Sequence, residues 1–369
     1  MIEMTRSYTA GWEAARTDCR RMWGEGMCEE ALDFFEKHLP EWHGWRERRP
    51  LADAFFRRLQ GGAPEAVRLH RLATPFETDP GFGSIVTRLG ASSFDDHLSV
   101  VHELEVASAL SSAGMVTRFM ENRAPGATLD RCPDLTTKVR DREIFVECFA
   151  QRQSESELHA SAIFHRIRSF RAPDSGVQVE IEFEDGIHVK VAYDRQTELL
   201  AAMDEASLTG RLVVVQGLAR VSPLPGAPFP AIPNFRLITG NTRDDLSRLQ
   251  RSLRNKGKRR QLSSSCAGIV AFRTHHLWIG KQAQFSQVCD WVREKVRGTL
   301  RRYPEIGSVV LLEKWMNSDW TDVSGSAAEG RLTYRGGFAR ALLAVRNDCA
   351  TVPVTPPEIE RIAEALDDL

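Results

Sequence analysis

The chain lacks several features that would place it in a common class. No apolar run approaches the roughly 18 residues that a membrane-spanning helix needs, so we expect no membrane segment. The first residues also lack the charged and then apolar layout of a secretory signal. A phosphate-loop motif, GxSxG and GxGxxG are all missing, which argues against an NTPase or an α/β-hydrolase.

Cysteine pairs and an excess of one charge are also lacking. The seven cysteines are odd in number, widely scattered and contain no CxxC pair, which indicates reduced thiols in a cytoplasm and argues against structural zinc. The 49 Lys and Arg residues are balanced by 50 Asp and Glu residues, so the chain is not a general polycation. Any binding to nucleic acid must therefore come from a local basic patch.

The most informative segment runs from 95 to 152 and predicts a helix, a strand and an acidic hairpin. The helix from 95 to 110 carries apolar residues at Val100, Leu104, Ala107 and Leu110, and Glu103 lies near the border of that stripe. A short strand follows around 117–120. Residues 133–139 and 144–149 then flank a tight turn at Arg140 and Asp141, which is a hairpin pattern.

The expected register of this hairpin brings two carboxylates together. A turn centred between Arg140 and Asp141 pairs Val139 with Arg142 and sets Asp134 across from Glu147. Cross-strand partners have Cβ atoms about 4.5–5.5 Å apart, so the two acids repel each other unless a cation lies between them or one is protonated. A shared Mg²⁺ explains the placement, and Glu103 is a candidate third ligand. The alternative is a solvated hairpin whose acids pair with nearby cations, namely Arg131, Lys138, Arg140 and Arg142.

These residues resemble the core of the PD-(D/E)xK nuclease superfamily. The resemblance rests on the helix sequence from His102 to Gly114, on Pro133 and Asp134, and on the run from Ile144 to Phe149. It implies a restriction-endonuclease-like fold of mixed α/β class, in which a mixed central sheet is flanked by helices. It also implies that Glu103, Asp134 and Glu147 hold one or two Mg²⁺ or Mn²⁺ ions.

The sequence departs from the family pattern at Phe149. The motif lysine would stand two residues after Glu147 on the same strand face, where its ammonium steadies the attacking water and the developing negative charge. Three replacements remain open: Gln151, Arg152, or a cation from a later helix. Without a replacement, the chain is a degenerate nuclease-like subunit that only binds.

The segment from 248 to 260 is strongly basic and is expected to form a helix followed by a buried strand at 266–272. Such a helix contacts phosphates, or it is a solvated face, and Lys256 or Lys258 is a candidate for the displaced catalytic cation. Its seven cations are Arg248, Arg251, Arg254, Lys256, Lys258, Arg259 and Arg260.

The expected organisation is an N-terminal helical region over 1–85 and a nuclease-like domain over 86–369. An insertion at about 154–240 interrupts that domain and contains β-strands. Within the insertion we expect a helix near 196–206, a stiff proline-rich loop over 222–230, and strands at 177–183, 188–193 and 212–216.

The sequence thus predicts a cytoplasmic, metal-dependent endonuclease of the PD-(D/E)xK type that acts on DNA. Family usage implies a bacterial defence or restriction setting. The expected catalytic residues are Asp134, Glu147 and Gln151, and the expected nucleic-acid contacts are Arg251, Arg254, Lys256, Lys258 and Arg260. The alternative is a catalytically silent subunit that binds nucleic acid or a partner protein; a homodimer is also open.

Overall fold

The computed structural model divides the chain into two compact units. Unit 1 comprises 1–151 and 246–369, and unit 2 comprises 152–245. The structure describes the ranges 24–39, 65–91, 94–120, 132–151, 176–184, 186–227, 242–259, 265–274, 284–316, 325–335 and 338–367. It also describes a few isolated residues and residue pairs outside these ranges.

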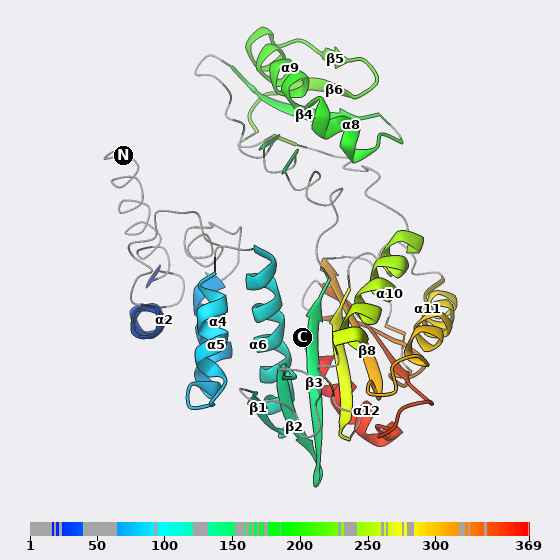
Figure 1. Ribbon diagram of the computed structural model, residues 1–369. Coiled ribbons are helices and arrows are strands. Elements are labelled where there is room, and N and C mark those ends of the chain that lie inside the picture. The colour runs from blue at the N-terminus through cyan, green and yellow to red at the C-terminus, as the bar shows by residue number, and fades with distance from the viewer. Residues whose placement is uncertain are drawn as a thin grey trace. The chain divides into compact units, whose positions relative to one another are not determined.

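Unit 1 is built on a seven-stranded mixed sheet (Figure 1). Its two central pairs, β3 with β7 and β7 with β8, are parallel, and the outer pairs are antiparallel. Parallel strands need a helical crossover between them, and α10 and α11 lie in those two connections. The spatial order is β1 (Val116–Phe119), β2 (Leu135–Val139), β3 (Arg142–Ala150), β7 (Ala267–Arg273), β8 (Ser308–Met316), β10 (Phe338–Arg346) and β9 (Arg331–Arg335).

One face of this sheet packs against the long helix α6 (Phe94–Ser112) and the C-terminal helix α12 (Pro356–Leu366). Val146 and Cys148 of β3 belong to this core, together with Leu104 of α6. The shorter helices α2 (Glu25–His38), α4 (Glu65–Ala73) and α5 (Phe82–Leu89) extend the same core, and a 3₁₀ turn at Thr74–Phe76 follows α4. The alternation along β3 therefore puts Cys148 on the α6 side.

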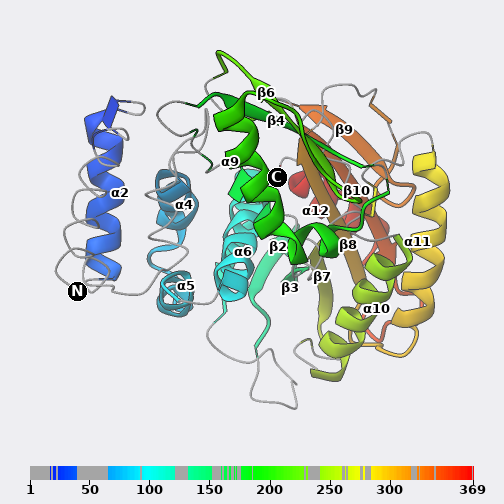
Figure 2. The ribbon, with the colours of Figure 1, turned by 90° about the horizontal axis from the view of Figure 1, so that it is seen from above.

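The opposite face is covered by α10 (Thr242–Arg259) and α11 (Phe285–Leu300), and Figure 2 shows these two helices across the sheet from α4, α5 and α6. Leu246, Leu249 and Leu253 of α10 are buried at helical spacing, and they pack in the same core as Phe145 of β3. Residues 145, 147 and 149 thus face α10.

Unit 2 is a small α/β unit with its own core. Its sheet has the order β4 (Gln178–Phe183), β6 (Ala219–Leu224) and β5 (Val213–Val215), all antiparallel. Helix α9 (Gln196–Thr209) packs on β4, β5 and β6. A core formed by residues between 163 and 221 holds the unit together.

Two expectations for unit 2 are wrong. The predicted strand at 188–193 is helix α8 (Val189–Asp194), where the His188 ring accepts the Lys190 N–H as an N-terminal cap. Val189 and Ala192 are buried at helical spacing, whereas Val191 is 41% exposed. The first residues of the predicted loop at 222–230 belong to β6 instead. A proline at position 223 is tolerated in this strand because β5 pairs with β6 only as far as Val221, so no strand on the β5 side needs an N–H from Pro223.

The mixed α/β class and the sheet flanked by helices are confirmed, and the 133–149 hairpin forms with its two-residue turn at Arg140 and Asp141. The expected boundary at 85 falls inside α5, whose buried stripe joins the core of unit 1. No described helix is long and apolar enough to cross a membrane.

Candidate active site

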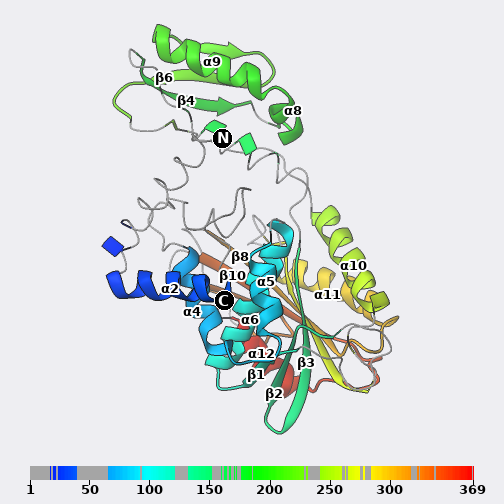
Figure 3. The same ribbon diagram turned by 60° about the vertical axis from the view of Figure 1, so that its left-hand side comes forward.

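Figure 3 shows the hairpin formed by β2 and β3. The pairing register puts Asp134 and Glu147 at the open end of this hairpin. Val139 pairs with Arg142 and Leu135 with Val146, as the turn-centred register predicts, so Asp134 comes one step beyond the last pair. The Cys148 N–H donates a 2.8 Å hydrogen bond to Asp134 Oδ2 and fixes that carboxylate against β3. Both acids therefore belong to one end of one strand pair.

Glu147 is buried, and its counter-charge comes from α10. The Lys256 ammonium contacts Glu147 Oε1, and it also lies 5.5 Å from the centre of the Phe149 ring. Phe149 in turn packs on Phe272 of β7 with ring centres 4.6 Å apart. A cation thus stands over Phe149, the position at which the sequence resemblance led us to expect a lysine. The solvated-hairpin alternative is wrong for Glu147, whose exposed fraction is 1%.

The charges of this site perturb one another. Burial and the negative charge of Asp134 raise the pKa of Glu147 to about 8, although the Lys256 ammonium opposes that rise. Burial lowers the pKa of Lys256, but attraction to Glu147 and Asp134 outweighs it, so the net pKa is above its ordinary value. Perturbed carboxyl groups beside a cation are typical of catalytic sites.

Glu103 is held by an arginine that the sequence analysis missed. Arg88 of α5 donates from Nη1 to Glu103 Oε1 at 2.8 Å and from Nη2 to Oε2 at 2.5 Å. Burial and Asp134 nonetheless raise the pKa of Glu103 to about 7. No sequence pattern connects Arg88 with Glu103, because the contact depends on how α5 packs against α6.

Helix α5 is anchored so that Arg88 reaches Glu103. The Asp79 carboxylate accepts the Phe119 N–H at 3.0 Å, which ties the segment before α5 to β1. A Cβ at Gly81 would overlap the backbone of Met120, so glycine is needed for this close approach.

The residues fit a divalent cation in part. Asp134 and Glu147 are carboxylates of like charge at one strand end, and the buried Oε2 of Glu147 has no hydrogen-bond partner among the described residues. Oxygen ligands of this kind suit Mg²⁺ and Mn²⁺. Within the described part of the chain, however, no group of three His, Cys, Asp or Glu side chains is arranged to hold a metal ion. Of the three expected ligands, Glu103 is taken up by Arg88, so Asp134 and Glu147 form the acidic pair of the site.

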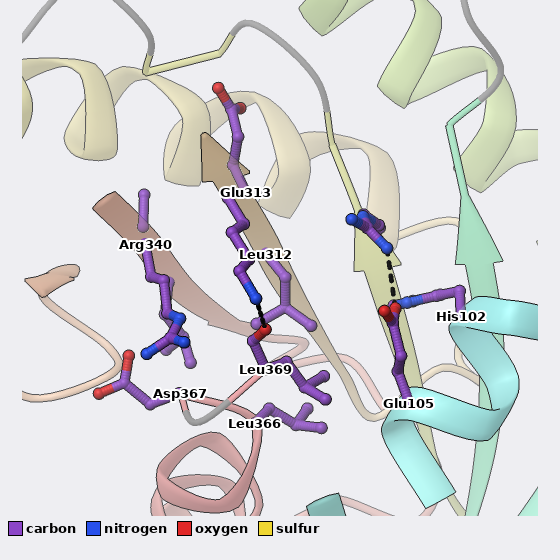
Figure 4. A pocket seen from close by; sticks show the side chains of 12 residues that line it. His102, Glu105, Leu312, Glu313, Arg340, Leu366, Asp367 and Leu369 are labelled. Carbon is purple, nitrogen blue, oxygen red and sulfur yellow. Dashed lines mark hydrogen bonds and ion pairs between the residues drawn. The ribbon is translucent and has the colours of Figure 1, made fainter. Parts of the chain in front are cut away.

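A small cavity lies beside α6, β7, β8, β10 and α12, apart from the acidic end of the hairpin (Figure 4). Its volume is about 30 Å³, and Glu105 is one of its lining residues. Arg68 and Arg273 each donate to Glu105 at 2.8 Å. The two glutamates of α6 thus belong to different surroundings: Glu105 is held at this cavity and Glu103 at Arg88.

The other expected site residues are distributed as follows. Arg251, Arg254 and Lys258 are exposed on α10, so this part of the basic helix is solvent-facing. Gln151 is buried, and its backbone N–H donates a 2.8 Å hydrogen bond to the backbone carbonyl of Arg273. Arg152 and Arg260 lie outside the described residues. Arg142, proposed as a partner for the hairpin acids, pairs with Glu358 at 3.0 Å.

Comparisons with family models, with curated proteins and with solved structures find no match to this chain. The resemblance to PD-(D/E)xK nucleases therefore rests on the sequence motifs alone.

Proposed function

We propose that this chain is a Mg²⁺- or Mn²⁺-dependent nuclease that acts on DNA, with a restriction-endonuclease-like core. The observation that carries the proposal is the contact of Lys256 with Glu147 above Phe149. An acidic pair with a cation beside it is the chemistry that a PD-(D/E)xK site requires, and here the cation comes from α10 instead of β3.

Each described residue has a distinct role in this proposal. Asp134 and Glu147 hold the metal, and the Cys148 N–H keeps the Asp134 carboxylate in place. A bound Mg²⁺ supplies a water of lowered pKa and neutralises charge on the scissile phosphate. The Lys256 ammonium stabilises the negative charge that develops there, as the motif lysine would.

The exposed side of α10 supports a nucleic acid as the substrate class. Arg251, Arg254 and Lys258 stand at positions three and four residues apart, which places them along one side of the helix. Leu249 and Leu253 occupy the buried side. These exposed cations would bind phosphates on the outer side of α10, whereas Lys256 lies on the inner side of the same helix, where it contacts Glu147.

The proposal is tested by incubating the purified protein with plasmid DNA, linear DNA and RNA in Mg²⁺ or Mn²⁺. We expect DNA cleavage that Asp134→Asn slows by at least about a hundredfold, because a carboxylate ligand is lost where charge must be stabilised. Asp141→Asn, in the exposed turn of the same hairpin, is the matched control and should cleave normally.

A second candidate follows from Phe149, whose ring is packed against Phe272 where the motif lysine would extend. It is a nuclease-like subunit that binds nucleic acid without cutting it. Retained DNA binding with no cleavage in either metal, under conditions where the fold is intact, would favour this candidate over the enzyme.

A further inference from the structure

The contact between Arg88 and Glu103 uses the whole carboxylate. Each Glu103 oxygen accepts from a different Nη atom of Arg88, so the pair is bidentate. Bidentate arginine–carboxylate pairs are among the strongest and most directional charged contacts in proteins. Neither oxygen of Glu103 is left without a donor.

Glu147 differs from Glu103 in this respect. Lys256 contacts only Oε1 of Glu147, and Oε2 has no partner among the described residues. A metal bound at Glu147 can use the second oxygen while the ammonium keeps the first. A metal bound at Glu103 would have to break a bidentate pair.

Exposure distinguishes the two partners of this pair, although it does not distinguish Glu103 from Glu147, which is 1% exposed. Only 2% of the Glu103 side chain is exposed, against 38% of the Arg88 side chain. The group that this pair presents to an incoming ligand is therefore the guanidinium, not the carboxylate. Guanidinium groups bind phosphate oxygens, whereas hydrated Mg²⁺ binds carboxylates.

We propose that Glu103 is a positioning residue that holds Arg88 as a phosphate-binding cation beside the metal pair, and that Glu103 does not itself bind the metal. This inference rests on the proposed nuclease function. It assigns the metal to Asp134 and Glu147, and it makes Arg88 a second cation for the substrate phosphate in addition to Lys256.

Arg88 has donors to spare for this task. A guanidinium carries five N–H groups, of which the contacts to Glu103 use two. One N–H remains on each Nη atom. Burial lowers the pKa of Arg88, but the hydrogen bonds and charge of Glu103, and then the charge of Asp134, raise it above its ordinary value. An unpaired third carboxylate would repel the phosphate, whereas the Arg88–Glu103 pair carries no net charge and offers the remaining N–H groups of Arg88 to the phosphate.

The first experiment measures Mn²⁺ affinity by calorimetry without DNA, on the full chain. Glu103→Gln keeps the size of the side chain and an oxygen acceptor for Arg88, so we expect its Mn²⁺ affinity to stay within about twofold of wild type. Asp134→Asn should lower the affinity by at least about tenfold. An equal loss in both variants would overturn the inference and leave the nuclease proposal intact. No loss in Asp134→Asn would overturn the proposed function itself.

The second experiment measures DNA binding in EDTA as a function of salt. Arg88→Gln should reduce the slope of log affinity against log salt by about 0.9, the value for one phosphate contact, and should slow cleavage by at least about a hundredfold. Arg68→Gln is the matched control, because Arg68 is 37% exposed and pairs with Glu105 on the same helix. Its slope should equal that of wild type.

Arg88→Lys is a second, more conservative variant in case Arg88→Gln does not fold. It keeps the positive charge but cannot form the bidentate contact of a guanidinium. We expect it to retain the wild-type salt slope while cleavage falls, because the single ammonium no longer positions the phosphate. A folded Arg88→Gln protein with an unchanged slope and unchanged cleavage would refute the phosphate contact.

Discussion

Lys256 follows Glu147 by 109 residues, yet it contacts the same carboxylate that a lysine two positions along β3 would approach. If Lys256 replaces the motif lysine, Lys256→Met should slow DNA cleavage by at least about a hundredfold, because one transition-state donor is lost. Lys190→Met is the control, since Lys190 is also a helix lysine that pairs with a carboxylate, at Asp194. Single-turnover cleavage assays measure both.

Gln151 was one of the three replacements left open by the sequence, together with Arg152 and a cation from a later helix. The same assay on Gln151→Ala separates Gln151 from Lys256: a large loss there with normal cleavage by Lys256→Met would contradict the role of Lys256. Phe149→Lys should perturb cleavage only modestly, since the position of the cation is already filled from α10.

The raised pKa of Glu147 makes metal binding depend on pH. Below its pKa of about 8, Glu147 holds a proton that must leave before the carboxylate binds metal. Mn²⁺ affinity should therefore rise roughly tenfold per pH unit from 6 towards 8 and then level off. Calorimetry at pH 6, 7, 8 and 9 measures this, and an affinity that is constant across the series would contradict it.

The same shift has a second consequence for the metal-free protein. The pKa of Glu147 in the folded state lies above its ordinary value of 4.5. Glu147 thus contributes stability that is fully present below about pH 4.5 and is lost as pH rises through about 8. The free energy of unfolding of the metal-free chain should fall over that window.

At the scale of elements, the position of α10 depends on a glycine next to Lys256. A Cβ on Gly257 would overlap the ring of Tyr303, which packs against the α10–α11 core. Overpacking costs about 1–3 kcal/mol, which exceeds the gain of up to about 1 kcal/mol that alanine brings to a helix. Gly257→Ala should therefore lower the free energy of unfolding and reduce cleavage by displacing Lys256.

The control for this change is Gly298→Ala on α11, where a Cβ meets nothing within 4 Å. That variant should be neutral or more stable in denaturant unfolding. If overlap with Tyr303 causes the loss of stability in Gly257→Ala, the double variant Gly257→Ala and Tyr303→Leu should regain part of the free energy of unfolding. A Gly257→Ala protein as stable as wild type would show that the Tyr303 ring moves aside without loss of stability.

Short sequence patterns predicted the elements that depend only on residues close in the chain. The register of β2 with β3 followed from a two-residue turn, and Arg140 adopts the positive φ of 56° that this tight turn needs. Helix α8 was missed because alternating Val189, Val191 and Tyr193 suit a strand equally well. Only packing showed that Val189 and Ala192 are the buried pair. Arg88 was missed for the same reason, since its partner lies on another helix.

At the scale of the whole molecule, the chain contains cores that do not share residues. The core of unit 2 draws on residues between 163 and 221, whereas those of unit 1 draw on both flanking segments. The expected insertion at about 154–240 lies close to the bounds of unit 2. Separate cores are expected to unfold as separate cooperative units.

Two isoleucines with the same burial test this independence. Ile181 of β4 and Ile269 of β7 are both 0% exposed, in unit 2 and unit 1 respectively. Replacing either by alanine leaves a cavity and should cost about 2–5 kcal/mol. Ile181→Ala should speed hydrogen exchange in 178–224 and leave β3 and β7 protected, whereas Ile269→Ala should do the reverse. Faster exchange across both units in either variant would mean that they unfold as one, and unit 2 would then contribute to the stability of unit 1.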